Sequence, residues 1–473
     1  MRSPPRISRR RALAAMAAAG LGAAPGCVAR RSGGLSLAAF STEVTVPLGH
    51  GMMGGAWVSK SVADPLEARG IVLCGSGRPV VFVSVDWCEI RNDAYTLWQQ
   101  RLASAAGTTP ERVLLSTIHQ HDAPIADLAA ESLLRSRGLA GSICDPVFHE
   151  QAVRQTASVL SSAMAQRRRV SHVGTGIAKV ERLASNRRYT MPDGAVRFDR
   201  TSATRNAFAI QAEEGLIDPW LRCLSFWDDE TPLAALSFYA VHPMSYYGQG
   251  EVSADFPGLA RRRRQRENPS VFQLYASGCS GNVTAGKYND GSRENRPKLA
   301  DRLGEAMRAA WNTTERYPVS RWRLRTEPVP FTPRDSTGFS RLELEAKLSP
   351  GHAPFQQCLA AMGLSWQERV KRGRPIQVPC LDLGAAMLLL LPGETYVEFQ
   401  LAAQRLRPDR FVCVAGYGDG ATGYVPTRRH WEEGDSNLTD WCWVNPDSES
   451  TLLEAMRRAM EAEESRLKVR STT

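Results

Sequence analysis

Four apolar runs of this 473-residue chain end in side chains that can bind a metal or move a proton. The runs and the residues that follow them are 113–118 with His119-Gln120-His121-Asp122, 233–241 with His242-Pro243, 387–391 with Pro392-Gly393-Glu394, and 411–415 with Gly416-Tyr417 and then Gly423-Tyr424. Two histidines and one glutamate form the ligand set of many hydrolytic zinc sites, which keep one position open for water. The pattern therefore predicts a metal-dependent hydrolase.

The spacing of His119 and His121 allows the two rings to have different roles in one site. On an extended backbone, residues i and i+2 project from the same face, so both imidazoles can enter one site. One ring can then bind the metal while its neighbour accepts and donates protons near neutral pH.

Each of these residues also has an ordinary structural interpretation. A histidine at a strand end, such as His242 before Pro243, is often a surface or capping residue. Glu394 could begin a helix and complement the positive end of its dipole. The joint occurrence of these side chains at several strand ends favours a metal site over the separate structural roles.

Buried strands are predicted at five short apolar runs rich in Val, Leu or Phe: residues 80–85, 113–118, 233–241, 386–391 and 411–414. Helices are predicted between them, where apolar side chains recur at every fourth position. The clearest cases are Leu299, Leu303 and Met307 after Pro297, and Leu452, Met456 and Met460. The alternation predicts an α/β fold, a large mixed-sheet domain with helices packed on the sheets and the zinc site at the carboxyl ends of strands. No repeat or Pro/Gly/Ser-rich linker divides residues 35–473, so we expect one large catalytic domain.

Residues 1–34 are predicted to be an export signal of the twin-arginine type. Arg9, Arg10 and Arg11 precede an apolar stretch that runs to Gly26 and is too short for a bilayer, which needs about 20 residues. Cys27 follows directly, so a lipoprotein signal is an alternative, and an amphipathic helix that stays on the protein is less favoured. The protein is therefore expected to be periplasmic, extracellular or anchored to a membrane by lipid.

The net charge of +10 raises the question of a nucleic acid or an anionic surface as a partner. Seven of the 59 basic residues lie in the first 31 positions, which hold no Asp or Glu, so the rest of the chain carries only +3. The arginine runs 167–169 and 261–264 could bind phosphate, but such runs are more often solvated helix ends. No aromatic residues are interleaved with them, so no nucleic-acid partner is expected.

The ten cysteines do not form a metal or redox motif of the usual spacing, because no two are separated by two residues. Cys74, Cys88, Cys223 and Cys413 lie in or beside apolar runs, where a free thiol behaves as a small apolar side chain. One or two disulfides formed after export are an alternative, with no pairing indicated.

Taken together, these segments resemble the neutral/alkaline ceramidase family, zinc amidases that split ceramide into sphingosine and a fatty acid. Ordered short matches extend over roughly residues 45–430. They include Gly54-Gly55, the run from Val80 to Asp86, Ile118-His119-Gln120-His121, Asn186-Arg187, Val241-His242-Pro243, Gly393-Glu394 and Gly423-Tyr424-Val425-Pro426-Thr427.

The resemblance implies a role for each matching residue. His119, His242, Glu394 and Tyr424 are the implied zinc ligands. His121 is the implied proton-handling residue, and Arg187 is implied to lie near the substrate amide, where its charge would stabilise the oxyanion. Ser280 would orient water or substrate, or act as a nucleophile. Asp122 and Asp255 are candidates for supporting the site, with a plain structural role as the alternative.

The chain also departs from the family pattern. The first motif continues as Asp122-Ala123-Pro124-Ile125 instead of Ser-Gly-Pro-Gly-Gly, and the serine segment, Ser277 to Asn282, keeps Ser280 and Asn282 but lacks the family's Asp and Pro. The family's C-terminal immunoglobulin-like domain is not expected in this chain. The implied substrate is a lipid or another N-acyl small molecule, with peripheral membrane association as one option. The alternatives are a zinc hydrolase of another amide or ester, and an exported binding protein without catalytic activity.

Overall fold

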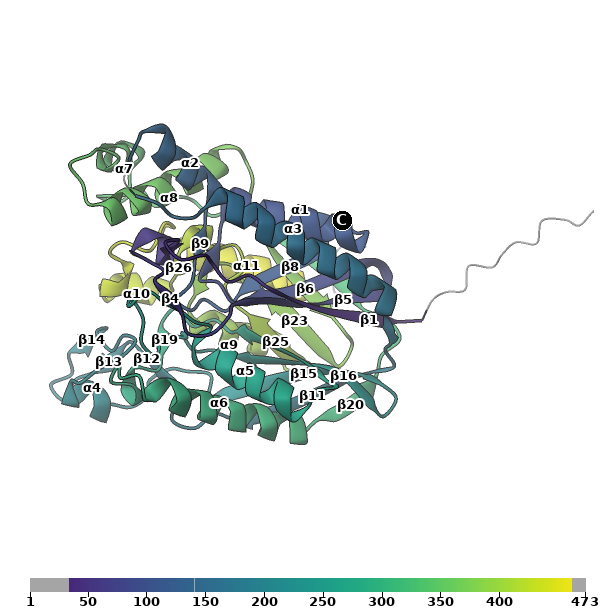
Figure 1. Cartoon of the computed structure of the whole chain (residues 1–473). Coiled ribbons are helices and arrows are strands. Elements are labelled where there is room, and N and C mark those ends of the chain that lie inside the picture. Colours follow the sequence, from purple (N-terminus) through teal and green to yellow (C-terminus); the bar gives the residue numbers. More distant parts are fainter. Residues whose placement is uncertain (1–33, 140, 462–473) are drawn as a thin grey trace, which may run out of the picture. The chain divides into compact units, whose positions relative to one another are not determined.

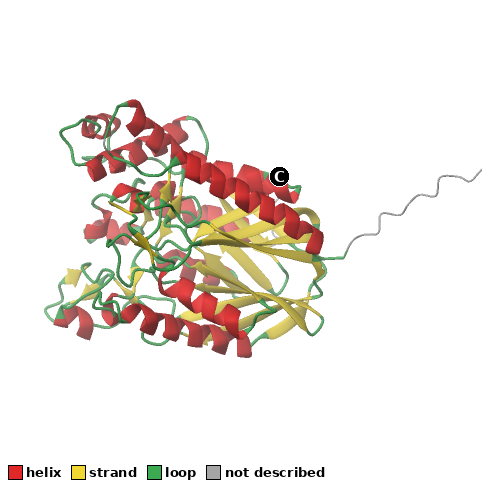
Figure 2. Cartoon of the chain, viewed as in Figure 1, coloured by secondary structure: helices red, strands yellow, loops and turns green. Residues whose placement is uncertain are grey.

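Three β-sheets form the centre of the molecule, and each contains one parallel pair of strands (Figures 1 and 2). The structure is a computed structural model that describes residues 34–139 and 141–461, all within one compact unit, Gly34–Thr473. The predicted export signal, including Cys27, lies outside the described residues except for its last position, Gly34.

Hydrogen bonding sets the order of the strands within each sheet. The first sheet runs in the order β10 (Arg168–Arg169), β1 (Ser36–Glu43), β5 (Glu67–Gly75), β6 (Gly77–Val85) and β8 (Val113–Thr117). The second runs in the order β18 (Phe272–Ser277), β16 (Thr231–Tyr239), β15 (Trp220–Asp228), β11 (His172–Lys179) and β20 (Glu315–Pro318). The third runs in the order β21 (Arg323–Val329), β22 (Ile376–Asp382), β23 (Ala386–Leu390) and β25 (Phe411–Ala415). The parallel pairs are β6–β8, β16–β18 and β23–β25.

Both faces of the parallel pairs are largely buried, which explains why these strands appear in the sequence as continuous apolar runs. In β6, Phe82 joins a core shared by all three sheets, together with Leu236 of β16 and Leu388 of β23. The alternate residues Val81 and Val83 face a second core beneath the helices. All five predicted strands and both predicted helices are present, and the α/β class is confirmed.

Helices cover the outer faces of the sheets. In Figure 1, α1 (Asn92–Ala106) and α3 (Pro146–Ala163) lie over the first sheet, and α5 (Asp255–Glu267) and α6 (Asn295–Asn312) cover the second. The third sheet contacts α9 (Val397–Leu406) and α11 (Ser448–Met460). A separate group of helices, which we call the helical lobe, contains α2 (Leu128–Ser136), α7 (Arg341–Lys347) and α8 (Pro354–Lys371). None of the helices in the described ranges is long and apolar enough to cross a membrane.

Short strands that pair in twos lie outside the three large sheets, and several of them directly follow a strand of a parallel pair. These are β7 (Glu89–Ile90) with β9 (Ile125–Ala126), β12 (Ser185–Asn186) with β19 (Val283–Thr284), β24 (Glu394–Thr395) with β26 (Tyr424–Val425), β2 (Gly51–Met52) with β3 (Trp57–Val58), β4 (Ser61–Val62) with β17 (Glu251–Val252), and β13 (Tyr189–Thr190) with β14 (Val196–Arg197). The short helices α4 (Ala207–Gln211) and α10 (Arg428–Glu432) lie among them (Figure 1). These elements surround the residues that the sequence singled out.

The second arginine run differs from the prediction. Residues 261–264 lie within α5, and Arg261 and Arg264 are buried, so the run is not a solvated helix end. Arg261 pairs with Asp86 at 2.6 Å and with Glu67 at 2.8 Å. A charge run cannot reveal such partners, because they lie far away in sequence. Run 167–169 is exposed as expected.

The cysteines between residues 34 and 461 are all free, and eight of these nine are buried. Cys88, Cys223 and Cys413 are buried as predicted, whereas Cys74 is only half-buried. The alternative of one or two disulfides is therefore not realised in the part of the chain that the structure describes.

Candidate metal centre

The ends of three strands from three different sheets are hydrogen-bonded to one another, and this junction carries the candidate site. The Thr117 N–H at the end of β8 donates to the carbonyl of Tyr417 after β25 at 2.9 Å. The Gly416 N–H donates to the carbonyl of Ser277 at the end of β18 at 2.8 Å, and the Ser277 hydroxyl donates to the carbonyl of Ile118 at 2.7 Å. The carboxyl ends of the parallel pairs therefore meet at one place.

Two histidines and one glutamate converge at this junction. The Nε2 atoms of His119 and His242 each lie 3.3 Å from Oε2 of Glu394. All three side chains are buried, with relative exposures of 1%, 0% and 2%. None of the three atoms makes a hydrogen bond to another described group. Since buried polar atoms are normally satisfied, three such atoms pointing at one another indicate a missing common partner.

The spacing and chemistry of these atoms fit a zinc ion. Two ligands that bind zinc tetrahedrally at about 2.0–2.2 Å lie about 3.3–3.6 Å apart, in agreement with the observed contacts. The remaining nitrogen of each ring is also held: Nδ1 of His119 lies 3.0 Å from the Cys88 carbonyl, and Nδ1 of His242 lies 2.8 Å from the Ser280 carbonyl. A proton on Nδ1 satisfies these carbonyls and leaves the Nε2 lone pair free for a metal.

Sharp backbone turns place these side chains directly after their strands. His119 and Tyr417 have left-handed φ values of 60° and 54°, which are uncommon for residues with a side chain. Gly393, just before Glu394, has φ of 51°, and a Cβ atom there would lie 2.6 Å from the carbonyl oxygen of Gly423. Such strained positions cluster where a structure needs a particular side-chain direction, and in this junction they direct ligands towards one another.

His121 lies beside the three converging atoms without joining them. Its ring centroid is 5.3 Å from that of His119 and 5.4 Å from that of His242. The residue is half-buried, and neither ring nitrogen has a hydrogen-bond partner among the described residues. Burial is the main cause that lowers the pKa of His121 well below its usual value, and the Arg187 charge acts in the same direction. The ring is therefore neutral near pH 7 and can accept a proton.

Arg187 and Tyr424 form a pair next to Glu394. Nη1 of Arg187 donates to the Tyr424 hydroxyl at 2.6 Å and to the side-chain carbonyl of Asn437 at 3.1 Å. Glu394 and Tyr424 are direct neighbours in the β24–β26 ladder. Burial raises the pKa of the Tyr424 hydroxyl, and the Arg187 charge opposes this rise. The structure thus brings Tyr424 to the site, while its role as the fourth ligand stays a prediction.

Ser280 is held behind His242. Its carbonyl accepts from the His242 ring, and its hydroxyl shares a 2.6 Å hydrogen bond with the hydroxyl of Tyr417. The sequence indicated Tyr417 only as a residue at a strand end. Its ring stacks on His119 with centroids 4.3 Å apart and planes inclined by 11°, and its hydroxyl lies 3.3 Å from Nδ1 of His242. Tyr417 therefore contacts both His119 and His242.

Sequence reasoning missed Glu89 entirely. Its Oε1 atom lies 3.9 Å from Nδ1 of His119, and its Oε2 atom accepts from Arg91 at 2.8 Å. Burial raises the pKa of Glu89 to about 7, although the Arg91 charge opposes the rise. The one available signal was an acidic residue between Cys88 and Ile90, shortly after a buried strand.

Asp122 and Asp255 do not join the three ligand atoms. Both lie near Arg296, at 3.4 Å in each case, and both are buried. Asp122 also accepts from the backbone N–H of Gly248 at 3.0 Å, and Asp255 accepts from Ser245. Their interactions hold backbone segments around the site.

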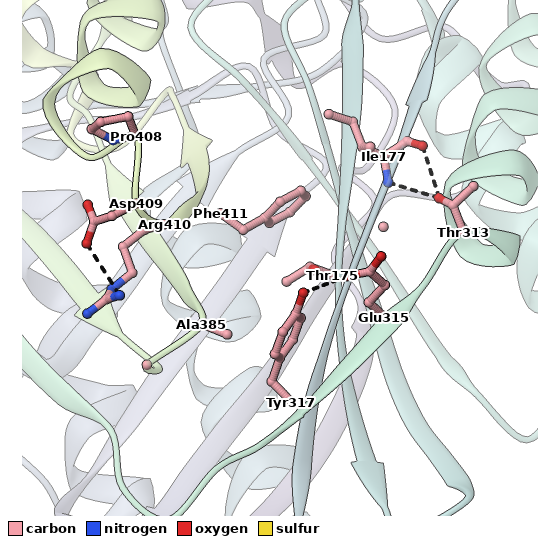
Figure 3. Close-up of a pocket in the computed structure, with 12 residues that line it drawn as sticks. Thr175, Ile177, Thr313, Glu315, Tyr317, Ala385, Pro408, Asp409, Arg410 and Phe411 are labelled. Atoms are coloured by element: carbon pink, nitrogen blue, oxygen red, sulfur yellow. Dashed lines mark hydrogen bonds and ion pairs between the residues drawn. The ribbon is translucent and has the colours of Figure 1, made fainter.

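A large pocket of about 760 Å³ lies away from this site (Figure 3). Phe411 and Ala385, which line it, stand at the beginnings of β25 and β23, whereas the ligand junction is at the opposite ends of these strands.

Comparisons with known proteins bear on the fold. No family model matches the chain, and no curated protein matches it. Its structure is similar to that of the neutral ceramidase from Pseudomonas aeruginosa, with 18% sequence identity and a TM-score of 0.66 over 90% of this chain and 73% of that chain. A ceramidase complexed with C2 matches with the same identity and TM-score, over 90% of this chain and 74% of that one. The predicted resemblance is thus confirmed at the level of structure: the chain has the fold of the neutral ceramidases.

Proposed function

We propose that this protein is a zinc-dependent amidohydrolase that cleaves the N-acyl amide of ceramide or of a closely related lipid. The observation that carries the proposal is the convergence of the Nε2 atoms of His119 and His242 on Oε2 of Glu394, all buried and without another partner among the described residues. The shared fold with neutral ceramidases supports the choice of reaction class and substrate.

His119, His242 and Glu394 would hold the zinc, with Tyr424 as the fourth ligand. Zinc, when bound, supplies a Lewis acid that polarises a carbonyl and makes water more acidic. His121, neutral and without a hydrogen-bond partner in the described structure, accepts the proton of the attacking water and returns it to the leaving nitrogen.

Other buried groups complete the proposed reaction. Arg187 carries its charge beside Glu394 and stabilises negative charge as it develops on the carbonyl oxygen. Ser280 holds the His242 ring through its backbone carbonyl and Tyr417 through its hydroxyl, so this hydroxyl is better placed to fix Tyr417 than to act as a free nucleophile. These assignments give each strand-end residue one role in a single hydrolytic step.

The test is hydrolysis of a short-chain fluorescent ceramide by the purified protein, with and without a chelator. Activity should require stoichiometric zinc. His119→Ala should lose both zinc and hydrolysis, whereas His121→Ala should keep zinc and lose about 10²- to 10⁴-fold in rate. Full zinc retention in His119→Ala would refute the ligand assignment, and stoichiometric zinc without turnover of any amide would favour the binding-protein alternative.

A different amide or ester substrate is the second candidate. The observation that favours it is Asp122, a buried carboxylate directly after His121 where the family pattern has serine. Assaying simple N-acyl amino acids beside ceramide distinguishes the two substrates.

We also propose that residues 1–34 direct export and that residues 35–473 form the hydrolase domain. Arg9 to Arg11 and the apolar stretch behind them support this. Fractionation of cells that express the full chain and an Arg10→Lys, Arg11→Lys variant tests export, and lipid labelling of a Cys27→Ala variant tests whether the protein is membrane-anchored.

A further inference from the structure

Two aromatic rings form a stack beside His121. Tyr247 has its ring centroid 5.0 Å from that of His121, and Trp57 of β3 stacks on Tyr247 with centroids 5.8 Å apart and planes inclined by 28°. His121, Tyr247 and Trp57 are all half-buried, whereas His119 and His242 are buried. The stack therefore lies beside His121 and, like His121, is more exposed than the rings of His119 and His242.

The loop that carries Tyr247 is held on one side by a buried ion pair. Asp122 accepts the Gly248 N–H at 3.0 Å and lies 3.4 Å from Nη2 of Arg296. The same Nη2 atom donates to the carbonyl of Tyr246 at 2.8 Å, and the guanidinium lies 3.6 Å from the centre of the Tyr246 ring. The residues on both sides of Tyr247 are thus fixed by Asp122 and Arg296.

The beginning of the loop is fixed by a second set of buried contacts. Nε of Arg296 donates to the Ser245 hydroxyl at 2.8 Å, the Ser245 N–H donates to Asp255 at 2.9 Å, and the Asn289 amide donates to the Ser245 carbonyl at 2.7 Å. By contrast, the Tyr247 hydroxyl has one hydrogen bond within residues 34–139 and 141–461, a long one of 3.4 Å that it accepts from the Ser202 hydroxyl. The backbone is rigidly held, and the Tyr247 ring is left to face His121.

From this arrangement, and resting on the proposed function, we propose that Tyr247 and Trp57 form the part of the site that receives the leaving amine. His121 returns a proton to the leaving nitrogen, so a group that packs against His121 packs beside that nitrogen. Two adjacent aromatic rings favour an amine that carries an apolar chain over a small polar amine. Asp122 and Arg296 are positioning residues that act through Tyr247.

The selectivity between two leaving groups tests this proposal. We would compare kcat/KM for two amides with the same acyl group, one of octylamine and one of ethylamine. The unmodified protein should prefer the octyl amide. Tyr247→Ala should lower this preference about tenfold, mainly through KM, because the apolar chain loses an aromatic contact surface. Tyr247→Phe keeps the ring and should retain the preference.

A second pair of variants tests the positioning role of Asp122 and Arg296. Asp122→Asn weakens the ion pair with Arg296 and should lower the octyl preference in the same direction as Tyr247→Ala. Asp301→Asn is the matched control, because Asp301 lies on α6 with Arg296 but pairs with Arg263 at the protein surface. An equal loss for both amides in Asp122→Asn would overturn the positioning role. An unchanged preference in Tyr247→Ala would overturn the whole proposal.

Binding of the free amines separates this proposal from the proposed function. If the unmodified protein hydrolyses no amide, the proposed function fails, and calorimetry with octylamine and ethylamine still tests the rings. Tighter binding of octylamine that is lost in Tyr247→Ala would support the amine site. Equal or undetectable binding of both amines by the unmodified protein would refute it. Zinc content and thermal midpoints show whether each variant is folded. If Asp122→Asn does not fold, the result for Tyr247→Ala alone tests the amine site.

Discussion

His149 is expected to make the protein less stable in mild acid. Its ring lies on α3 against Trp87 and Trp98, with centroid distances of 6.0 and 6.4 Å, and neither nitrogen has a hydrogen-bond partner in the described structure. Burial, with a smaller effect from His50, lowers the pKa of His149 from 6.5 to about 4. Because the pKa is lower in the folded state, protonation favours unfolding, and stability falls as the pH drops from about 6.5 towards 4.

The size of the effect follows from this shift in pKa. A difference of about 2.5 pH units corresponds to about 3.4 kcal/mol when the pH lies below both values. At pH 5, where protonation is incomplete, the linkage relation gives about 2 kcal/mol. For a domain of this length the entropy of unfolding is about 0.9 kcal/mol/K, so the thermal midpoint should move by about 2 °C.

The assay compares thermal midpoints at pH 8 and pH 5 for the unmodified protein and for His149→Leu, which removes the titrating group. The fall in midpoint between the two pH values should be about 2 °C smaller in the variant. His352→Leu, which removes a half-buried histidine just before α8, is the control and should leave the fall unchanged. An identical pH dependence in His149→Leu and the unmodified protein would show that His149 is not held neutral by burial.

Three further substitutions test the candidate site. Arg187→Gln should lower kcat about 10²- to 10³-fold with zinc retained, because the charge that stabilises the oxyanion is lost while the proposed ligands remain. Steady-state kinetics and metal analysis measure both effects, and an unchanged kcat would contradict the role of Arg187. Tyr417→Phe removes the hydroxyl near Ser280 and His242 and should weaken zinc binding about tenfold in a chelator competition, whereas unaltered affinity would place Tyr417 outside the ligand network. Gly393→Ala forces a side chain onto a left-handed residue next to Gly423 and should cost about 2 kcal/mol or more, seen as a lower thermal midpoint; a wild-type midpoint would show that the turn adapts.

The strand ends were the part of the molecule that the sequence predicted best. Buried parallel strands require apolar runs, so the polar residues that follow each run stand out, and His119, His242 and Glu394 were found in this way. Helices α6 and α11 were equally visible, because one face of each must be apolar. Both predictions rest on burial, which produces a recognisable pattern of apolar residues in the sequence.

Contacts between segments that are distant in sequence produce no such pattern. The stacking of Tyr417 on His119 depends on two left-handed turns in different sheets, and neither residue is the glycine that would have indicated such a turn. Arg261 looked solvated because its partner Asp86 belongs to a distant part of the chain. Glu89 was overlooked for the same reason, since its proximity to His119 arises only when β6 and β8 lie side by side.

The junction of β8, β18 and β25 also affects how the protein assembles. Each of the three sheets supplies one of the converging atoms, through His119, His242 and Glu394, so no single sheet could bind the proposed zinc ion tightly. Tight metal affinity should therefore appear only after all three sheets have docked. A bound ion would then act as a cross-link between sheets, and would slow their separation more than it slows fraying within any one of them.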